Sequence, residues 1–415
     1  MDVIVAEVIG IIALVTLVAG LFSAAARRLG QPAVIGQIVA GVVLGPSVLG
    51  RFPGDPTAHL FPAHAVPYIN VLGQVAVVIF MFGVGYEIEF RALRRQGSSA
   101  QLVALCAVSV PLALGVLVVA LDHSAFAALG GHPDQRAFVM FIAAAVSISA
   151  LPVLAAIVRD RGLAGTRAGI TATAAAALMD VLAWLVLAAA VIGAGPKPRF
   201  TLPVTTVLVV VFIVLMLALV RPALGWWLAR SSVLASPATL AFVLAAGGAW
   251  VTAELGLHPI FGAFLAGLTL RGSRPPDAEV VSSMERAGNL LLPLFFITTG
   301  LSLNVGSVGV TGFEVLALVT AAACLGKLVP AYLAGRLTGL DKTDARTVAA
   351  LVNTRGLTEL IALNVGLADG IITSRLFTVL VLMALVTTLA TGPLLSAIRP
   401  VTAPAEVGEP VAVAD

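Results

Sequence analysis

The stretch AVSISALPVLAAIV at residues 145–158 decides the fold, because it is an apolar helix with an interruption built into it. Pro152 has no backbone N–H, and its ring obstructs the turn before it. Ser147 and Ser149 add polar atoms just ahead of that point. Taken alone, the pattern fits either a plain proline kink or a true break. In a membrane, a true break is tolerated only where the freed backbone lines a cavity or is buried in protein.

A second apolar stretch, VNTRGLTELIAL at residues 352–363, is interrupted in the same way. Asn353 and Thr354 carry side chains that compete for backbone hydrogen bonds, and Gly356 lowers the helix propensity further. We therefore expect an unwound segment at this point. The sequence predicts two discontinuous helices, one around Pro152 and one around Gly356.

The composition of the chain is that of a membrane protein. Of its 415 residues, 60% are hydrophobic and only 11% are charged, which is too apolar for a protein with a water-exposed surface. Apolar runs of about 20 residues recur along the chain, and a helix of that length crosses a hydrocarbon core about 30 Å thick. The runs do not alternate as the strands of a β-barrel would. We predict an all-α polytopic membrane protein.

Breaking the chain at its Pro, Gly and charge clusters predicts about thirteen transmembrane helices in a transporter domain over residues 1–400. The approximate segments are 3–26, 33–50, 67–90, 99–121, 136–158, 166–193, 201–220, 237–255, 258–270, 287–303, 312–336, 345–367 and 375–398. Residues 401–415 form a short tail, too short to fold alone.

The basic residues are concentrated in alternate loops, as the positive-inside rule requires. With the N-terminus outside, the inner loops hold Arg27, Arg28, Arg91, Arg94, Arg95, Arg159, Arg161, Arg167, Arg221, Arg230, Arg271, Arg274, Arg286, Arg336, Lys342, Arg346 and Arg399. The outer loops hold only Arg51, Arg136, Lys197, Arg199 and Arg375. The net charge of +3 therefore reflects membrane topology and not nucleic-acid binding. We predict an outside N-terminus and a cytoplasmic C-terminus and tail.

The two interrupted spans are the fifth and the twelfth of the series, and this offset of seven is odd. Two halves, about 1–195 and 237–400, joined by a linker helix at about 200–230, would then enter the membrane from opposite sides. Secondary transporters with discontinuous helices have this inverted-repeat arrangement. The pattern predicts inverted repeats in which the two broken helices cross near the midplane.

Four charged residues lie in the interior of predicted spans, away from the span ends, where each costs about 2.5–3.5 kcal/mol on insertion scales. Asp180 and Lys327 are each midway along a span, and they can offset the helix-end dipoles at a crossing. Arg355 and Glu359 are four residues apart and share a helix face. For this second pair, a structural ion pair and a transport role fit the sequence equally well.

Enzymatic and metal-cluster functions are disfavoured by what the sequence contains. There is no HExxH motif, the histidines fall in outer loops or at span ends, and Asp180 is a lone carboxylate at its depth. Cys106 and Cys324 are too few for a thiolate cluster. We expect no enzyme activity and no cofactor, and the only metal expected is a transported monovalent cation at Asp180.

Six strings, in this order, resemble the monovalent cation:proton antiporter-2 family of the cation:proton antiporter superfamily. They are PAVIGQIVAGVVLGPSVLG at 32–50, VIFMFGVGYEIEFRALRR at 78–95, SISALPVLAAIVRD at 147–160, LPLFFITTGLSLN at 292–304, GKLVP at 326–330 and NTRGLTELIALNVG at 353–366. The resemblance covers nearly the whole chain.

The resemblance implies a sodium/proton antiporter fold, in which a core with crossed broken helices packs on a dimerisation domain. Asp180 matches the family's ion- and proton-carrying aspartate, and Lys327 matches its intramembrane lysine. The remaining matches are Ser147 and Ser149, where the first broken helix lends oxygens to the site, and Asn353, Arg355 and Glu359 in the second broken helix. The implied partners are Na⁺ or K⁺, H⁺, membrane lipid and a second copy of the chain. The high Ala and Gly content points to a GC-rich bacterium, so the expected location is a bacterial inner membrane.

One position departs from the family pattern. Many relatives have Asn or Asp before the essential aspartate, where this sequence has Met179. Without that polar neighbour, Lys327 is expected to rely on Asp180 or on helix C-terminal carbonyls. The sequence predicts a cation/proton antiporter working by alternating access at Asp180. A channel-like cation efflux protein, an organic-anion symporter and a transporter fold repurposed for another substrate are the alternatives.

Overall fold

The computed structural model describes residues 2–87, 98–132, 134–191, 201–230, 236–271 and 277–398. Within these residues the protein is helical, and no strand occurs. The longer helices are α1 (Asp2–Arg28), α2 (Ala33–Leu44), α4 (Val66–Glu87), α6 (Ser98–Leu121), α8 (Arg136–Ser147), α9 (Leu151–Asp160), α10 (Arg167–Val191), α11 (Leu202–Leu215), α12 (Arg221–Arg230), α13 (Pro237–Glu254), α14 (Pro259–Arg271), α15 (Ala278–Leu301), α16 (Gly309–Leu337), α17 (Lys342–Val352), α18 (Leu357–Ala368) and α19 (Ser374–Ile398). The short helices α3 (Pro56–Leu60) and α7 (His123–Ala128) lie in loops.

The membrane-spanning character of the chain is confirmed. Ten helical segments in the described residues are long and apolar enough to cross a membrane. The other three predicted spans correspond to α13, to the 13-residue α14 and to the broken pair α17 and α18. The tail at 401–415 and the basic residues Arg91, Arg94, Arg95, Lys197, Arg199, Arg274 and Arg399 lie outside the described residues.

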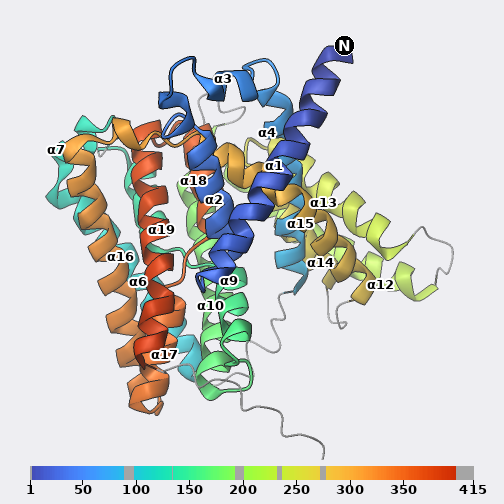
Figure 1. Ribbon diagram of the computed structural model, residues 1–415. Helices are drawn as coiled ribbons and strands as arrows, with labels where there is room; N and C mark the ends of the chain where they lie inside the picture. The colour runs from blue at the N-terminus through green and yellow to red at the C-terminus, as the bar shows by residue number, and fades with distance from the viewer. Residues whose placement is uncertain are drawn as a thin grey trace, which may run out of the picture.

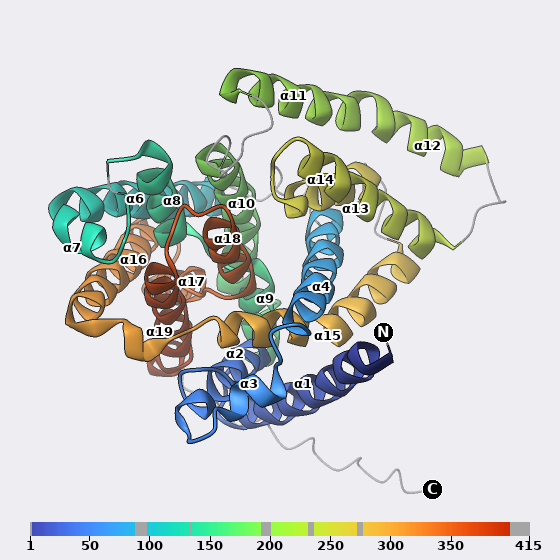
Figure 2. The ribbon, with the colours of Figure 1, turned by 90° about the horizontal axis from the view of Figure 1, so that it is seen from above.

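The helices form two packed groups, which Figures 1 and 2 show side by side. The scaffold group comprises α1, α2, α4, α13, α14 and α15. The core group comprises α6, α8, α9, α10, α16, α17, α18 and α19. Helices α11 and α12, joined by a π-helical turn (Met216–Val220), run along the outer edge of the scaffold, against α14 (Figure 2).

Each group draws three consecutive spans from the first part of the chain and three from the second, which is the pattern of inverted repeats. Helix α2 of the first repeat packs on α15 of the second. By position in the repeats, α2 corresponds to α14 and α4 corresponds to α15, and the corresponding pair α14 and α4 is also in contact. In the core, α6 pairs with α16. The boundaries of the two halves and of the linker helix, near 195, 200 and 237, remain predictions, since residues 192–200 and 231–235 lie outside the described part.

Glycines allow a close scaffold contact between α2 and α15. A Cβ atom built on Gly300 would lie 2.5 Å from the Cα atom of Gly41, closer than real contacts allow. We expect Gly300→Ala to destabilise the protein by about 1–3 kcal/mol through overpacking. Thermal unfolding of the detergent-purified protein measures this.

The matched control is Gly288→Ala on the same helix, where a Cβ atom would meet only the Leu292 side chain at 3.8 Å. Because alanine is the better helix former by about 0.8–1 kcal/mol, this change should be neutral or stabilising. Equal melting temperatures for both variants would show that the α2–α15 contact is looser than described.

Candidate functional site

The first interruption is a full break between two short helices. Helix α8 ends at Ser147 and α9 begins at Leu151, with 148–150 in non-helical conformation. Pro152 lies in the first turn of α9, where a missing N–H costs nothing because the first turn has no intrahelical acceptors for it. The proline therefore starts a new helix, and the alternative of a simple kink does not apply.

The second interruption lies between α17, which ends at Val352, and α18, which begins at Leu357. Residues 353–356 between them are not helical. Gly356 is required here by close packing, since a Cβ atom on it would lie 2.6 Å from Cγ2 of Val153 in α9. The two breaks therefore touch each other.

Hydrogen bonds between the two breaks satisfy the backbone groups that the interruptions set free. The N–H of Ala150 donates to the carbonyl of Thr354 at 3.1 Å. The Ser149 hydroxyl donates to the carbonyl of Val352 at 2.8 Å, and the Thr358 hydroxyl donates to the carbonyl of Ser149 at 2.9 Å. The predicted crossing of two discontinuous helices is present, and it supplies the partners that buried backbone groups need in a membrane.

Arg355 compensates the carboxyl end of α8. Its guanidinium, fully buried, donates to the carbonyl of Ala145 at 2.7 Å and to that of Val146. It also pairs with the buried carboxylate of Glu359 at 2.9 Å. Glu359 lies in the first turn of α18, where a negative charge is favourable. Each charge of this pair therefore also neutralises a helix end.

Lys327, on α16, reaches the same end of α8. Its buried ammonium donates to the carbonyl of Ile148 at 2.8 Å and to the hydroxyl of Ser149. Among the described residues no ion pair joins Lys327 to Asp180. Of the two expectations for Lys327, the helix C-terminal carbonyls are the partners observed.

Asp180 lies in the middle of α10 and is fully buried. Neither of its carboxylate oxygens has a hydrogen-bond partner of ordinary geometry in the described structure. The backbone amide of Leu151, at the positive end of α9, lies beside this carboxylate. A buried carboxylate without partners is unusual and needs an explanation such as a bound ion or proton.

Further oxygens without protein partners lie in the second break. The Oδ1 atom of Asn353 and the Oγ1 atom of Thr354 are buried and unpaired, whereas the Asn353 amide nitrogen faces the Sγ atom of Cys324 at 3.9 Å. The hydroxyls of the first break are engaged with protein groups, since Ser147 donates to the carbonyl of Val108 at 3.0 Å. No group of three or more His, Cys, Asp or Glu side chains that could hold a metal ion occurs in the described residues.

Met179 is fully buried in an apolar cluster that also contains Ala150 and Val352. It fills the space beside the crossing with a thioether and adds no oxygen to the site. The departure from the family pattern is therefore accommodated by apolar packing.

Thr388 of α19 is a site residue that the sequence did not reveal. Its hydroxyl accepts from the Arg355 N–H at 3.1 Å and lies 2.9 Å from the Arg355 carbonyl, to which it can donate. The Thr388 hydroxyl thus contacts both the N–H and the carbonyl of Arg355 in the unwound backbone of the second break. A threonine in an apolar helix gives no sequence signal for such a role, because the contact joins residues 33 positions apart.

The family model "Sodium/hydrogen exchanger, transmembrane" matches residues 12–398. The chain is 35% identical over 409 residues to the Na⁺/H⁺ antiporter NhaS4 of Synechocystis sp., covering 96% of this chain and 98% of that protein. It is 36% identical over 396 residues to cation/H⁺ antiporter 20 of Arabidopsis thaliana, covering 90% of this chain but only 46% of that protein. The chain thus spans about half the length of the plant relatives it matches.

A solved structure supports the fold. The sodium proton antiporter MjNhaP1 of Methanocaldococcus jannaschii aligns with a TM-score of 0.63 at 15% sequence identity. The alignment covers 95% of this chain and 97% of that one. At this identity the likeness concerns the fold alone.

Proposed function

Because the chain belongs to the sodium/hydrogen exchanger family of transmembrane proteins, we propose that it is a secondary active antiporter exchanging Na⁺ or K⁺ for protons. The observation that carries the proposal is Asp180, a fully buried carboxylate with no hydrogen-bond partner of ordinary geometry on either oxygen. Such a group is strongly unfavourable unless it is neutralised. Asp180 binds either a dehydrated cation or a proton, never both, and this competition makes the exchange obligatory.

The second break supplies neutral oxygens for the cation in this proposal. Asn353 Oδ1 and Thr354 Oγ1 are buried and unpaired, and helix α17, which ends just before them, packs on α10. Oxygen dipoles of this kind replace the hydration shell of an alkali cation. The first break contributes through Ser149, which links the Lys327 ammonium to the Val352 carbonyl.

The charges at the crossing bear on the stoichiometry. With Asp180, Glu359, Lys327 and Arg355 ionised, the formal charges sum to zero, so one cation or one proton gives the same total. A one-for-one exchange is then electroneutral. If Lys327 releases a proton when the cation binds, a second charge moves, and transport responds to voltage by about 2.3 kcal/mol per charge per 100 mV.

The membrane orientation, location and oligomeric state of the transporter are part of the same proposal. The positive-inside pattern supports an outside N-terminus and a cytoplasmic C-terminus. Bacterial relatives named as Na⁺/H⁺ and Na⁺/H⁺-K⁺ antiporters support location in a bacterial inner membrane, surrounded by lipid. A homodimer is proposed by analogy with the family fold.

Cation-dependent proton flux in proteoliposomes with a trapped pH dye tests the proposed function. We expect the addition of Na⁺ or K⁺ to a preformed pH gradient to dissipate it, whereas an equal concentration of a bulky organic cation does not. The response identifies the transported ion. Cation flux without counter-movement of protons would favour the channel-like alternative, and no response to any monovalent cation would favour a repurposed fold.

A further inference from the structure

Two small cavities share the lining residue Thr388, on the boundary between the scaffold and core groups. One is lined by Gly30, Gln31, Pro32, Ile157, Asp160, Arg161, Thr388 and Gly392. The other is lined by Val34, Ile35, Ile38, Arg355, Gly356, Leu360, Ala384, Leu385 and Thr388. We call them the vestibule and the inner pocket. Together they extend from the α1–α2 turn to the backbone of the second break.

The vestibule has several polar residues in its lining. The Oε1 atom of Gln31 is buried without a partner, and Asp160 lines the same cavity. Arg161 is tied to α19, since it donates to the Ser396 hydroxyl at 2.9 Å and to the Gly392 carbonyl at 3.3 Å. The cavity measures about 30 Å³, and a polar space of that size holds water.

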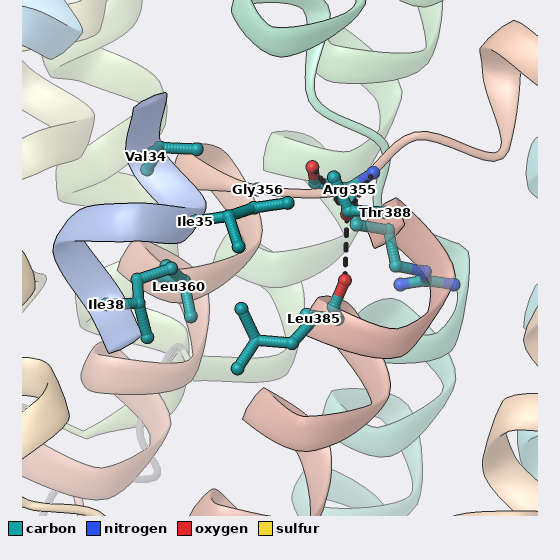
Figure 3. A pocket seen from close by; sticks show the side chains of 9 residues that line it. Val34, Ile35, Ile38, Arg355, Gly356, Leu360, Leu385 and Thr388 are labelled. Carbon is teal, nitrogen blue, oxygen red and sulfur yellow. Dashed lines mark hydrogen bonds between the residues drawn. The ribbon is translucent and has the colours of Figure 1, made fainter. Parts of the chain in front are cut away.

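The inner pocket is apolar except where it meets the second break. Figure 3 shows the side chains of Ile35, Ile38 and Leu385 on one side of it, and the Arg355 guanidinium pointing away from them. The Thr388 hydroxyl and the Arg355 backbone are therefore the polar groups that the pocket offers. A constriction lined by apolar side chains excludes ions when it is dry.

We propose that the vestibule, Thr388 and the inner pocket form an access passage for the transported cation, with Thr388 at its constriction. The proposal rests on the proposed antiporter function. The passage ends at Arg355 and Gly356, next in sequence to the unpaired oxygens of Asn353 and Thr354. Its apolar wall is formed by α2 of the scaffold facing α18 and α19 of the core, so relative movement of the two groups opens or closes it.

Silver ion, a monovalent cation that bonds thiols, tests whether a cation reaches Thr388. The Thr388→Cys variant is made in a background with Cys106→Ala and Cys324→Ala and reconstituted in liposomes. Thiols left free after brief Ag⁺ exposure are counted by maleimide labelling of the unfolded protein. The control is Thr387→Cys, since Thr387 is fully buried, bonds the Met383 carbonyl at 2.9 Å and lines neither cavity.

We expect Thr388→Cys to react about tenfold or more faster than Thr387→Cys, because thiol reactivity follows access. Equal rates would overturn the proposal. This measurement needs no transport, so its result is separate from that of the flux assay. Failure of the flux assay alone rejects the antiporter function, and failure of the silver assay alone rejects the passage.

Gly392→Leu tests whether the vestibule is the way in. A Cβ atom on Gly392 would lie 3.6 Å from both Arg161 Nη2 and Gln31 Nε2. A leucine side chain at this position would therefore occupy the vestibule without a backbone clash. Added to Thr388→Cys, it should slow the silver reaction about tenfold, because the polar space that admits the ion is filled. Gly20→Leu, on an open face of α1, is the control and should leave the rate unchanged.

An unchanged silver rate in Gly392→Leu would show that the ion arrives by another path and would reject the vestibule. Thermal unfolding of each variant confirms that it is folded before the rates are compared. If Gly392→Leu does not fold, Gly392→Val takes its place as the smaller plug.

Discussion

Asp180→Asn is expected to abolish cation-dependent proton flux while leaving the protein folded. The amide keeps the size of the side chain but cannot carry a negative charge or exchange a proton. Losing about 3 kcal/mol of interaction with the ion corresponds to a roughly hundredfold loss of affinity. The flux assay in proteoliposomes measures the loss, at saturating and at low cation concentration.

The stability of the same variant separates a transport role from a structural one. Neither oxygen of Asp180 has a hydrogen-bond partner of ordinary geometry, so the amide removes a buried charge without breaking a well-formed hydrogen bond. We therefore expect Asp180→Asn to melt at the same temperature as the wild type or higher. A strong loss of stability would mean that the carboxylate holds helices together, contrary to the proposal.

Asp369→Asn provides a matched control for the flux experiment. Asp369 follows α18 outside the predicted spans, and burial raises the pKa of its carboxyl to about 6. The substitution makes the same chemical change in a carboxyl that is partly buried, whereas Asp180 is fully buried. Flux should persist in Asp369→Asn, and its loss in both variants would indicate a general effect of removing buried carboxyls.

The second large effect is expected from breaking the buried pair of Arg355 and Glu359. Glu359→Leu leaves the Arg355 guanidinium charged, buried and without its carboxylate, which costs about 3–5 kcal/mol. Arg355→Met should cost more, because it also removes the donor to the carbonyls of Ala145 and Val146. Thermal unfolding in detergent measures both.

The double variant Arg355→Met with Glu359→Leu should be more stable than Arg355→Met alone, since no unpaired charge remains. Glu7→Gln is the control, because it removes an exposed ion pair instead of a buried one. The Glu7 carboxylate pairs with His64 at 2.6 Å on the surface, where such pairs contribute about 0–1 kcal/mol. Equal effects of Glu359→Leu and Glu7→Gln would show that the buried pair is well solvated.

Much of the architecture follows from local properties of the sequence. The spans follow from hydropathy, and the two breaks follow from Pro152 and from the run Asn353 to Gly356, because these residues disfavour a helix wherever they occur. The odd offset between the breaks also predicts the inverted repeat. Asp180 and Lys327 stand out because charge inside an apolar run is costly in any fold.

The contacts at the crossing depended on the tertiary structure. Lys327 bonds the Ile148 carbonyl and not Asp180, and Thr388 holds the Arg355 backbone, although nothing near either residue in the sequence indicates these partners. The two cavities at Thr388 are likewise formed by the α1–α2 turn, α2, α9, α18 and α19 together.

The sequence by itself determined which segments cross the membrane, where two of them break and which buried charges need compensation, because hydropathy, helix propensity and charge are properties of local residues. The tertiary structure alone decided which charge compensates which helix end and which cavities border the second break. Those outcomes depend on distances between residues up to about 200 positions apart, such as Lys327 and Ile148 with a separation of 179.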